Sequence, residues 1–264
     1  MIKNILTIAG SDSSGGAGIQ ADIKTISALG CYAMSVVTAI TAQNTSGVRA
    51  VDLVDTKLVR MQLEAIFDDI RVDAIKIGML GSSEIIYTVA DCLIDRNIPI
   101  VLDPVMVAKS GDSLLNADAV TALKDALLPL TTLLTPNLPE AAVLLGQKEA
   151  ESRLVMERQA KALLKLGVGT VLLKGGHLLG SESPDLLATE AELMWFDEKR
   201  FHTKNTHGTG CTLSSALATF IGQDYSVPDA TSSAKEYLTK AIQSADQLDV
   251  GSGHGPTHHF WKRS

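Results

Sequence analysis

Residues 5–30, ILTIAGSDSSGGAGIQADIKTISALG, combine a strand, a glycine-rich turn and a helix in immediate succession. The apolar run at 5–10 has the length of a strand, and the apolar residues of 18–30 recur at helical spacing. The three glycines between them allow the backbone to approach a ligand closely, and the helix start offers N–H groups to an anion. This stretch predicts a βα unit of a parallel sheet, with a ligand-binding turn after its strand.

The same alternation continues along most of the chain. The spacing of apolar residues predicts strands at 34–41, 73–78, 99–103, 131–136 and 169–176, and helices at 57–70, 84–96, 122–130 and 151–167. Short alternating segments at 185–203 predict an antiparallel hairpin, followed by helices near 210–222 and 228–247. No linker or repeat divides the sequence. We therefore expect one α/β domain over residues 1–264, a mostly parallel sheet with helices on both faces.

Composition excludes several classes of protein. The 264 residues are 45% hydrophobic and 20% charged, as in globular proteins, and the net charge of -7 argues against nucleic-acid binding. No apolar run has the roughly 18–20 residues of a membrane span, and the N-terminus is too polar for a signal peptide. Cys31, Cys92 and Cys211 are far apart, so we expect free thiols and a cytoplasmic protein.

The turn at 10–22 has the features of an anion site, although its glycines do not follow the GxGxxG spacing. No suitable acidic residue ends a second strand either, which disfavours a nicotinamide-dependent dehydrogenase. The alternative is a flexible turn with a Ser or Asp helix cap.

Polar and apolar residues after two further strands suit a ring-shaped ligand. Gln43 offers donors and an acceptor to the edge of a heterocycle, and Met79, Val105 and Met106 could form an apolar wall. Asp103 ends a strand, where a carboxylate can organise a metal ion or a water, and residues 107–113 resemble a mobile flap. Ordinary loop chemistry and core packing remain the alternatives.

Two motifs near the middle of the chain point to phosphate and magnesium. Asn137 and Glu140 have the spacing of a helix capping box, which is the default interpretation, but Glu140 could also hold Mg²⁺ through water. Lys174 follows an apolar strand and precedes two glycines, a position that packing explains poorly. Its ammonium group would suit a phosphate.

The segment KNTHGTGCTLSSA at 204–216 predicts a site at a helix N-terminus. The backbone N–H groups of Gly208, Thr209 and Gly210 would gather around an anion, as phosphoryl transfer requires. We expect the same field to lower the pKa of Cys211 in the first turn. The alternative is a structural cysteine in an apolar helix.

In combination, these motifs resemble the ribokinase-like small-molecule kinases, and within them the hydroxymethylpyrimidine/phosphomethylpyrimidine kinases of thiamine biosynthesis. The resemblance covers about residues 4–260 and rests, in order, on AGSDSSGGAGIQADIKT, TAQNT, KIGML, LDPVMVAKSGD, TPNLPEA, LLKGGH, NTHGTGCTLSSALA and GHGP. Cys211 is its most specific feature, because most ribokinase-like enzymes have aspartate there. Ser13 departs from the proline of many relatives, and we expect it to leave the loop more flexible.

The resemblance implies a three-layer αβα sandwich with an ATP and Mg²⁺ site beside a pyrimidine pocket. The residues that match the family's substrate positions are Gly10, Asp22, Gln43, Met79 and Val105. On the nucleotide side are Asn137, Lys174 and Thr206, with Glu140 and Asp103 near the metal and Lys174, Gly208, Thr209, Gly210 and Cys211 at the transferred phosphate. It also implies a homodimer, and two successive phosphorylations, of the hydroxymethyl group and then of the monophosphate.

The expected chemistry is in-line transfer of the ATP γ-phosphoryl group, with Cys211 as the candidate acceptor of the hydroxyl proton. A pyridoxal or pyridoxine kinase is the nearest alternative, since its substrate is also a hydroxymethylated ring. A cysteine hydrolase using Cys211 and His207 is an alternative from another class. A zinc site from His254, His258, His259 and a cysteine lacks the usual ligand spacing.

Overall fold

The computed structural model describes residues 1–106 and 116–263. Its strands are β1 (Asn4–Asp12), β2 (Tyr32–Asn44), β3 (Gly47–Leu53), β4 (Ala74–Ile77), β5 (Ile100–Leu102), β6 (Leu133–Leu134), β7 (Thr170–Lys174), β8 (Asp185–Ala188) and β9 (Leu193–Phe196). Its helices are α1 (Gly18–Ala28), α2 (Thr56–Phe67), α3 (Ser83–Leu93), α4 (Ala117–Ala122), α5 (Leu138–Leu145), α6 (Arg153–Leu164), α7 (Thr209–Gly222) and α8 (Val227–Gln243). Short helical turns occur at η1 (Leu123–Leu127), η2 (Leu128–Leu130), η3 (Ala245–Gln247) and η4 (Trp261–Arg263).

Within these described residues the strands form a nine-stranded sheet in the order β3-β2-β1-β4-β5-β6-β7-β8-β9. The strands from β2 to β7 in this order are parallel, and β3, β8 and β9 add antiparallel pairs at the two edges. The hairpin at 185–203 is therefore confirmed as β8 and β9. The β2–β3 hairpin was not predicted.

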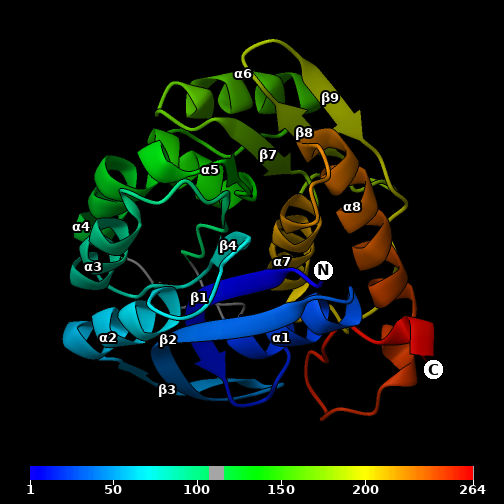
Figure 1. The fold of residues 1–264 in the computed structure, drawn as a ribbon. Helices are drawn as coiled ribbons and strands as arrows, with labels where there is room; N and C mark the ends of the chain where they lie inside the picture. The colour runs from blue at the N-terminus through cyan, green and yellow to red at the C-terminus, as the bar shows by residue number, and fades with distance from the viewer. Residues whose placement is uncertain (107–115, 264) are drawn as a thin grey trace.

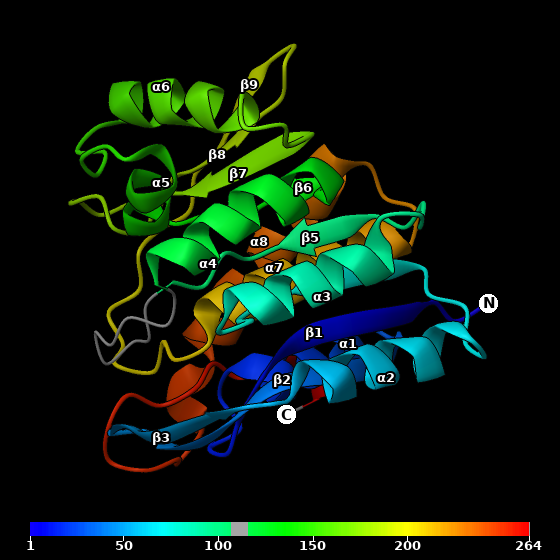
Figure 2. The ribbon, with the colours of Figure 1, turned by 90° about the vertical axis from the view of Figure 1, so that its left-hand side faces the viewer.

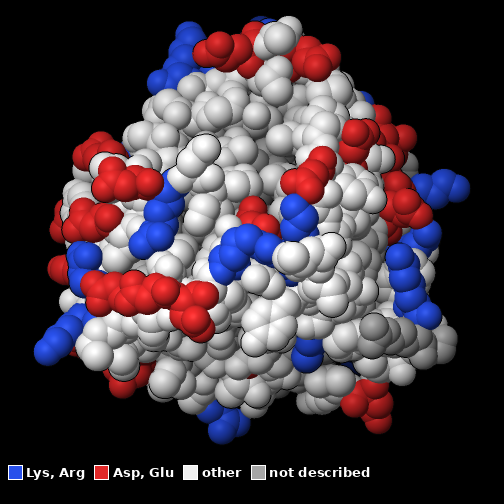
Figure 3. All heavy atoms as spheres, viewed as in Figure 1, with Lys and Arg blue, Asp and Glu red and all other residues white. Residues whose placement is uncertain are grey.

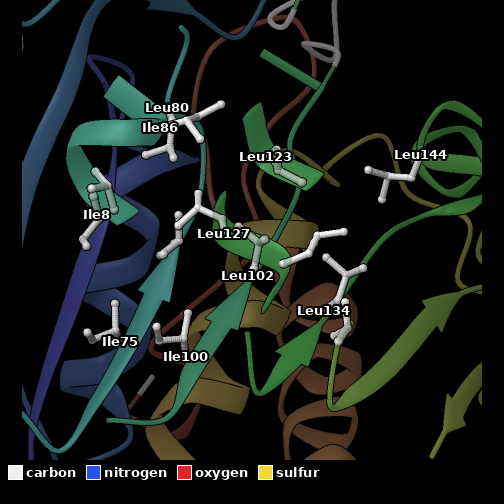
Figure 4. Close-up of a cluster of buried hydrophobic side chains, with 14 of the residues drawn as sticks. Ile8, Ile75, Leu80, Ile86, Ile100, Leu102, Leu123, Leu127, Leu134 and Leu144 are labelled. Atoms are coloured by element: carbon white, nitrogen blue, oxygen red, sulfur yellow. The ribbon is translucent and has the colours of Figure 1, made fainter. Parts of the chain in front are cut away.

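Helices cover both faces of the sheet, which gives three layers (Figures 1 and 2). Helices α2 to α6 bury apolar side chains on one face, and α1, α7 and α8 bury theirs on the other. Successive residues of a strand point to opposite faces, so Ile75 belongs to the first core and Ala74 to the second. Figure 4 shows the first core, where Ile8, Ile100 and Leu102 lie among other buried aliphatic side chains. The αβα expectation is confirmed.

Several boundaries differ from those predicted. Strand β1 continues through Asp12, and β2 runs to Asn44, so Gln43 lies in a strand rather than in a loop. The helix expected at 122–130 begins earlier, at Ala117, where the Asn116 side chain accepts from the N–H of Ala119 at 2.8 Å. The flap expected at 107–113 lies outside the described residues.

Surface charge agrees with the composition. On the face shown in Figure 3, acidic and basic side chains are interspersed and form no continuous basic patch. In the described part of the chain, no helix combines the length and the apolar character needed to cross a membrane.

Candidate active site

A cavity of about 780 Å³ lies at the carboxyl ends of the parallel strands. Strands β1, β2, β4 and β7 each place at least one polar residue at its wall, and Asp103 does so directly after β5. Every predicted site residue except Asp22 lines it: Gly10, Gln43, Met79, Val105, Asp103, Asn137, Glu140, Lys174, Thr206, Gly208, Thr209, Gly210 and Cys211. The fold thus gathers residues from distant parts of the chain into one site.

Lys174 lies at the centre of the charged part of this cavity. Its Nζ is 2.8 Å from Asp103 Oδ1 and 4.0 Å from Glu140 Oε2, and only 14% of its side chain is exposed. Burial alone would lower the pKa of Lys174, but the two carboxylates raise it above its usual range. The ammonium group therefore remains charged at the cavity wall, which suits an anionic ligand.

Asn137 and Glu140 form the predicted capping box at the start of α5. The Asn137 side chain accepts from the N–H of Glu140 at 2.8 Å, and Glu140 Oε2 accepts from the N–H of Asn137 at 2.7 Å. Both residues also face the cavity, so the structural role does not exclude the functional one. Burial raises the pKa of Glu140 to about 7, although the charge of Lys174 opposes the shift.

The donor chemistry of this corner fits Mg²⁺. Asp103 and Glu140 offer carboxylate oxygens, which are hard ligands, beside a cation that can hold phosphate. Among the described residues, no group of three or more His, Cys, Asp or Glu could hold a metal ion by itself. A site of this kind suits an ion that takes its remaining ligands from water and substrate phosphates.

The loop before α7 is shaped by close backbone contacts. Gly208 has φ +78°, and a Cβ there would meet the carbonyl oxygen of Gly16 at 1.8 Å, so this position requires glycine. At Gly210 a Cβ would fit, 3.4 Å from Asp103 Oδ2 and 3.6 Å from Lys174 Nζ. The N-terminus of α7 therefore faces the Lys174 ammonium group, and its first N–H groups have no acceptor within the helix.

Cys211 lies in the first turn of α7 on the cavity wall. The expected lowering of its pKa is wrong. Burial of the thiol raises its pKa to about 11, and the charge of Lys76 and the N–H of Gly18 only partly offset this. The nearby carboxylates of Asp22 and Asp103 raise it further, so the field of the helix does not decide the protonation state of this thiol.

One end of the cavity lies at β1 and β2. Gln43 and Val105 line it, together with Met79, which packs so closely on Gly10 that a Cβ there would be 2.7 Å from Met79 Cε. Gly10 is thus the residue that admits the methionine. The expected polar edge and apolar wall meet at this end.

Asp22 is fully buried beneath this region instead of lining the cavity. Its carboxylate accepts from Lys76 Nζ at 2.8 Å and 3.0 Å, from Thr7 at 2.6 Å and from Ser215 at 2.7 Å. Lys76 is equally buried, which makes the two residues an internal ion pair. Asp22 is fully buried and presents no surface to the cavity. Its predicted contact with substrate therefore stays a prediction.

The alternative assignments find little support in the geometry. His207 Nε2 lies 2.9 Å from Asp12 Oδ2, and within the described residues no hydrogen bond joins His207 to Cys211, as a cysteine hydrolase would need. His259 is buried against Thr212, and burial lowers its pKa to about 3. His254, His258 and His259 belong to no metal-binding cluster among the residues described.

The far end of the cavity contains residues that the sequence did not identify. Phe201 follows β9, and Leu238, Thr239 and Ile242 lie on α8. Leu238 and Ile242 recur at the spacing of a core-facing helix surface, so no sequence signal separated them from packing residues. Lys76 was also missed, because a lysine inside a short apolar strand gives no sign of its buried partner.

Comparison with known proteins shows the family to which this chain belongs. The family model described as phosphomethylpyrimidine kinase matches residues 12–258. A Rhizobium meliloti protein named hydroxymethylpyrimidine/phosphomethylpyrimidine kinase is 52% identical over 260 residues, which cover 97% of this chain and 98% of that protein.

Two solved structures are similar over nearly the whole fold. The phosphomethylpyrimidine kinase of Clostridium difficile has a TM-score of 0.81 and 45% identity, and the alignment covers 91% of this chain and 99% of that one. An ADP complex of Bacillus subtilis pyridoxal kinase has a TM-score of 0.91 and 36% identity, covering 100% and 99% of the two chains. Because the family model matches residues 12–258, the chain belongs to the phosphomethylpyrimidine kinase family.

Proposed function

We propose that this protein transfers the γ-phosphoryl group of ATP to the hydroxymethyl group of 4-amino-5-hydroxymethyl-2-methylpyrimidine, and then phosphorylates the monophosphate to the diphosphate. The observation that carries the proposal is the position of Lys174. Its ammonium group lies between Asp103 and Glu140, beside the N-terminus of α7, and Gln43 lines the same cavity. A phosphate-holding group and a ring-recognising group therefore share one enclosure.

The strand order separates the two ends of this enclosure. Gln43 lies on β2, whereas Phe201, Leu238 and Ile242 lie beyond β7, next to β8 and β9. The apolar far end suits the adenine of ATP, and Asn137 and Thr206 line the same cavity. ATP then reaches the acceptor across Lys174, as in-line transfer requires.

Charge stabilisation is the main task of the central residues. Lys174 holds the transferring phosphoryl group, and the N–H groups of Gly208, Thr209 and Gly210 receive the charge that develops on its oxygens. Mg²⁺ held by Asp103 and Glu140 would supply further charge neutralisation at the phosphates when bound.

Cys211 acts by position rather than as an ionised base. With a pKa of about 11, about one thiol in 10⁴ is ionised at pH 7. In a loose transition state the hydroxyl proton leaves late, so a strong base at this position contributes little. The thiol instead fixes the acceptor hydroxyl beside the anion-binding loop.

A direct assay tests the function. Purified protein with ATP and Mg²⁺ is given hydroxymethylpyrimidine, its monophosphate or pyridoxal as the sole acceptor, and the products are resolved by chromatography and mass. We expect a monophosphate from the first acceptor and a diphosphate from the second. Turnover of pyridoxal alone would replace the proposal with its alternative, a pyridoxal kinase, which the Bacillus subtilis neighbour makes worth testing.

We also propose that two copies form a homodimer in the cytoplasm. Strand β3 lies at one edge of the sheet and exposes Val51 and Leu53, each 43% accessible, which suits a partner strand. Sedimentation equilibrium measures the stoichiometry. A cytoplasmic location fits Cys31, Cys92 and Cys211, which are all free thiols.

A further inference from the structure

The orientation of the Gln43 amide decides which ring edge it can bind. A carboxamide offers an oxygen acceptor on one side and an amino donor on the other. As placed, its nitrogen lies 3.2 Å from His207 Nε2, and its oxygen lies 3.4 Å from Thr41 Oγ1. The hydrogen-bonding partners of these two atoms determine whether that orientation is stable.

Asp12 determines which nitrogen of His207 carries hydrogen. The Asp12 carboxylate accepts from the N–H groups of Ser14, Gly16 and Ala17 and from the Ser14 hydroxyl, all within 3.1 Å. Burial alone would raise the pKa of Asp12, but these bonds and the one to His207 lower it to about 2. An ionised carboxylate only accepts, so the His207 Nε2 at 2.9 Å must donate to it.

A hydrogen on His207 Nε2 conflicts with the orientation that the Gln43 amide has in the structure. An N–H of Gln43 would face the N–H of His207, two donors with no acceptor between them. On the other side, the Thr41 hydroxyl donates its one hydrogen to the carbonyl of Ser11 at 2.9 Å and has only a lone pair left for Gln43. Half a turn of the amide removes both conflicts, because its oxygen can then share the His207 Nε2–H with Asp12 in a three-centre bond and its nitrogen can donate to Thr41.

We infer that His207, held by Asp12, is a positioning residue that fixes the Gln43 amide in this orientation and so selects the acceptor ring. The inference rests on the proposed function, in which Gln43 contacts the ring. Within the described residues, the remaining N–H and the remaining lone pair of Gln43 are then available to a ligand. They match a ring nitrogen next to an amino group, as in a 4-aminopyrimidine.

Further contacts hold the backbone around Gln43. Ser13 Oγ accepts from the Gln43 N–H and donates to the Gln43 carbonyl, both at 2.8 Å. A proline at position 13 could make neither bond. The serine predicted to loosen this loop therefore ties it to β2.

The C-terminal GHGP motif, at 253–256, holds the two sides of the arrangement together. The N–H of His254 donates to the Thr45 carbonyl at 2.8 Å, and the N–H of His207 donates to the Gly255 carbonyl at 3.0 Å. One segment thus fixes both the end of β2 and the histidine. This gives the motif a role that its sequence did not suggest.

The tautomer of His207 can be measured without any substrate. Long-range ¹H–¹⁵N spectra of histidine-labelled protein at pH 8 report which ring nitrogen is protonated, and a His207→Phe variant identifies the signal. We expect hydrogen on Nε2. A neutral ring with hydrogen on Nδ1 alone would overturn the inference, whatever the enzyme phosphorylates.

Kinetics then tests selection by Gln43. His207→Phe keeps a ring but removes the donor, so kcat/KM for hydroxymethylpyrimidine should fall about 10- to 100-fold, mainly through its KM. The KM for ATP should change less than about twofold, and the preference over pyridoxal should shrink. The matched control is His202→Phe, at an exposed position, which should change neither KM.

Two outcomes separate the inference from its premise. An equal loss for both acceptors, or for ATP as well, would show a merely structural role and overturn the inference, whereas a wild-type enzyme inactive on pyrimidines would overturn the proposed function. If His207→Phe does not fold, Thr41→Val removes the acceptor on the other side of the amide. It should raise the same KM, and an unchanged KM would contradict the inference.

Discussion

Replacement of Lys76 by methionine should destabilise the protein strongly, because it leaves a buried carboxylate without its cation. Lys76 and Asp22 are both fully buried, with Nζ 2.8 Å from Asp22 Oδ2. The Asp22 carboxylate raises the pKa of Lys76 above its usual range against the opposing effect of burial. After the substitution, only the hydroxyls of Thr7 and Ser215 among the described residues would remain to solvate Asp22.

The expected size follows from this burial. Removing one partner of a buried ion pair costs about 3–5 kcal/mol of unfolding free energy. For a chain of this length each kcal/mol lowers the melting temperature by about 2 °C, so we expect a loss of about 6–10 °C. The double variant Lys76→Met/Asp22→Leu removes both charges and should recover about 2–3 kcal/mol of the sum of the single losses.

Calorimetry or urea denaturation of the two single variants and the double variant measures this coupling energy. Lys161→Met, at an exposed position on α6, is the matched control and should change stability by less than about 0.5 kcal/mol. A loss below about 1 kcal/mol for Lys76→Met, or strict additivity in the double variant, would refute the argument. Either result would mean that water or a rearrangement solvates Asp22.

Three further predictions concern the cavity. Gly210→Ala should fold normally, since the new Cβ meets atoms no closer than 3.4 Å, but filling the space beside Lys174 should lower kcat about 10²- to 10³-fold; a near-normal kcat would argue against an anion site there. The rate of Cys211 alkylation by iodoacetamide, measured by peptide mass spectrometry, should rise with pH and reach half its maximum near pH 11. A midpoint below pH 8.5 would instead support Cys211 as a thiolate base. The pKa of Glu140 is about 7 in the folded state and 4.5 in the unfolded state. Between these two pH values the folded state binds a proton that the unfolded state has lost. The free energy of unfolding should therefore fall by about 3 kcal/mol as the pH rises from 4.5 to 7. Glu140→Gln should remove this loss in ligand-free denaturation curves, and an unchanged pH slope would contradict the burial argument.

Much of the fold could be predicted from local patterns. Continuous apolar strands alternating with amphipathic helices indicated a parallel sheet, because a strand buried on both faces cannot alternate in polarity. Lys174 and Asp103 could be assigned to one site for a related reason, since the carboxyl ends of parallel strands meet at one edge. The Asn137–Glu140 capping box was also visible, because its bonds join residues three apart.

Other features depend on contacts between distant segments. Lys76 and Asp22 are 54 residues apart, and His207 and Asp12 are 195 apart, so no spacing rule relates them. The sequence alone determined the layers of the fold and the edge where the cavity lies, and it predicted most of the residues that line the cavity. Only the tertiary structure decided that Asp22 is buried, that the Cys211 thiol stays protonated, and that Asp12 holds His207 beside Gln43. These properties depend on desolvation and on partners brought together by folding, and neither is encoded in any local stretch of the chain.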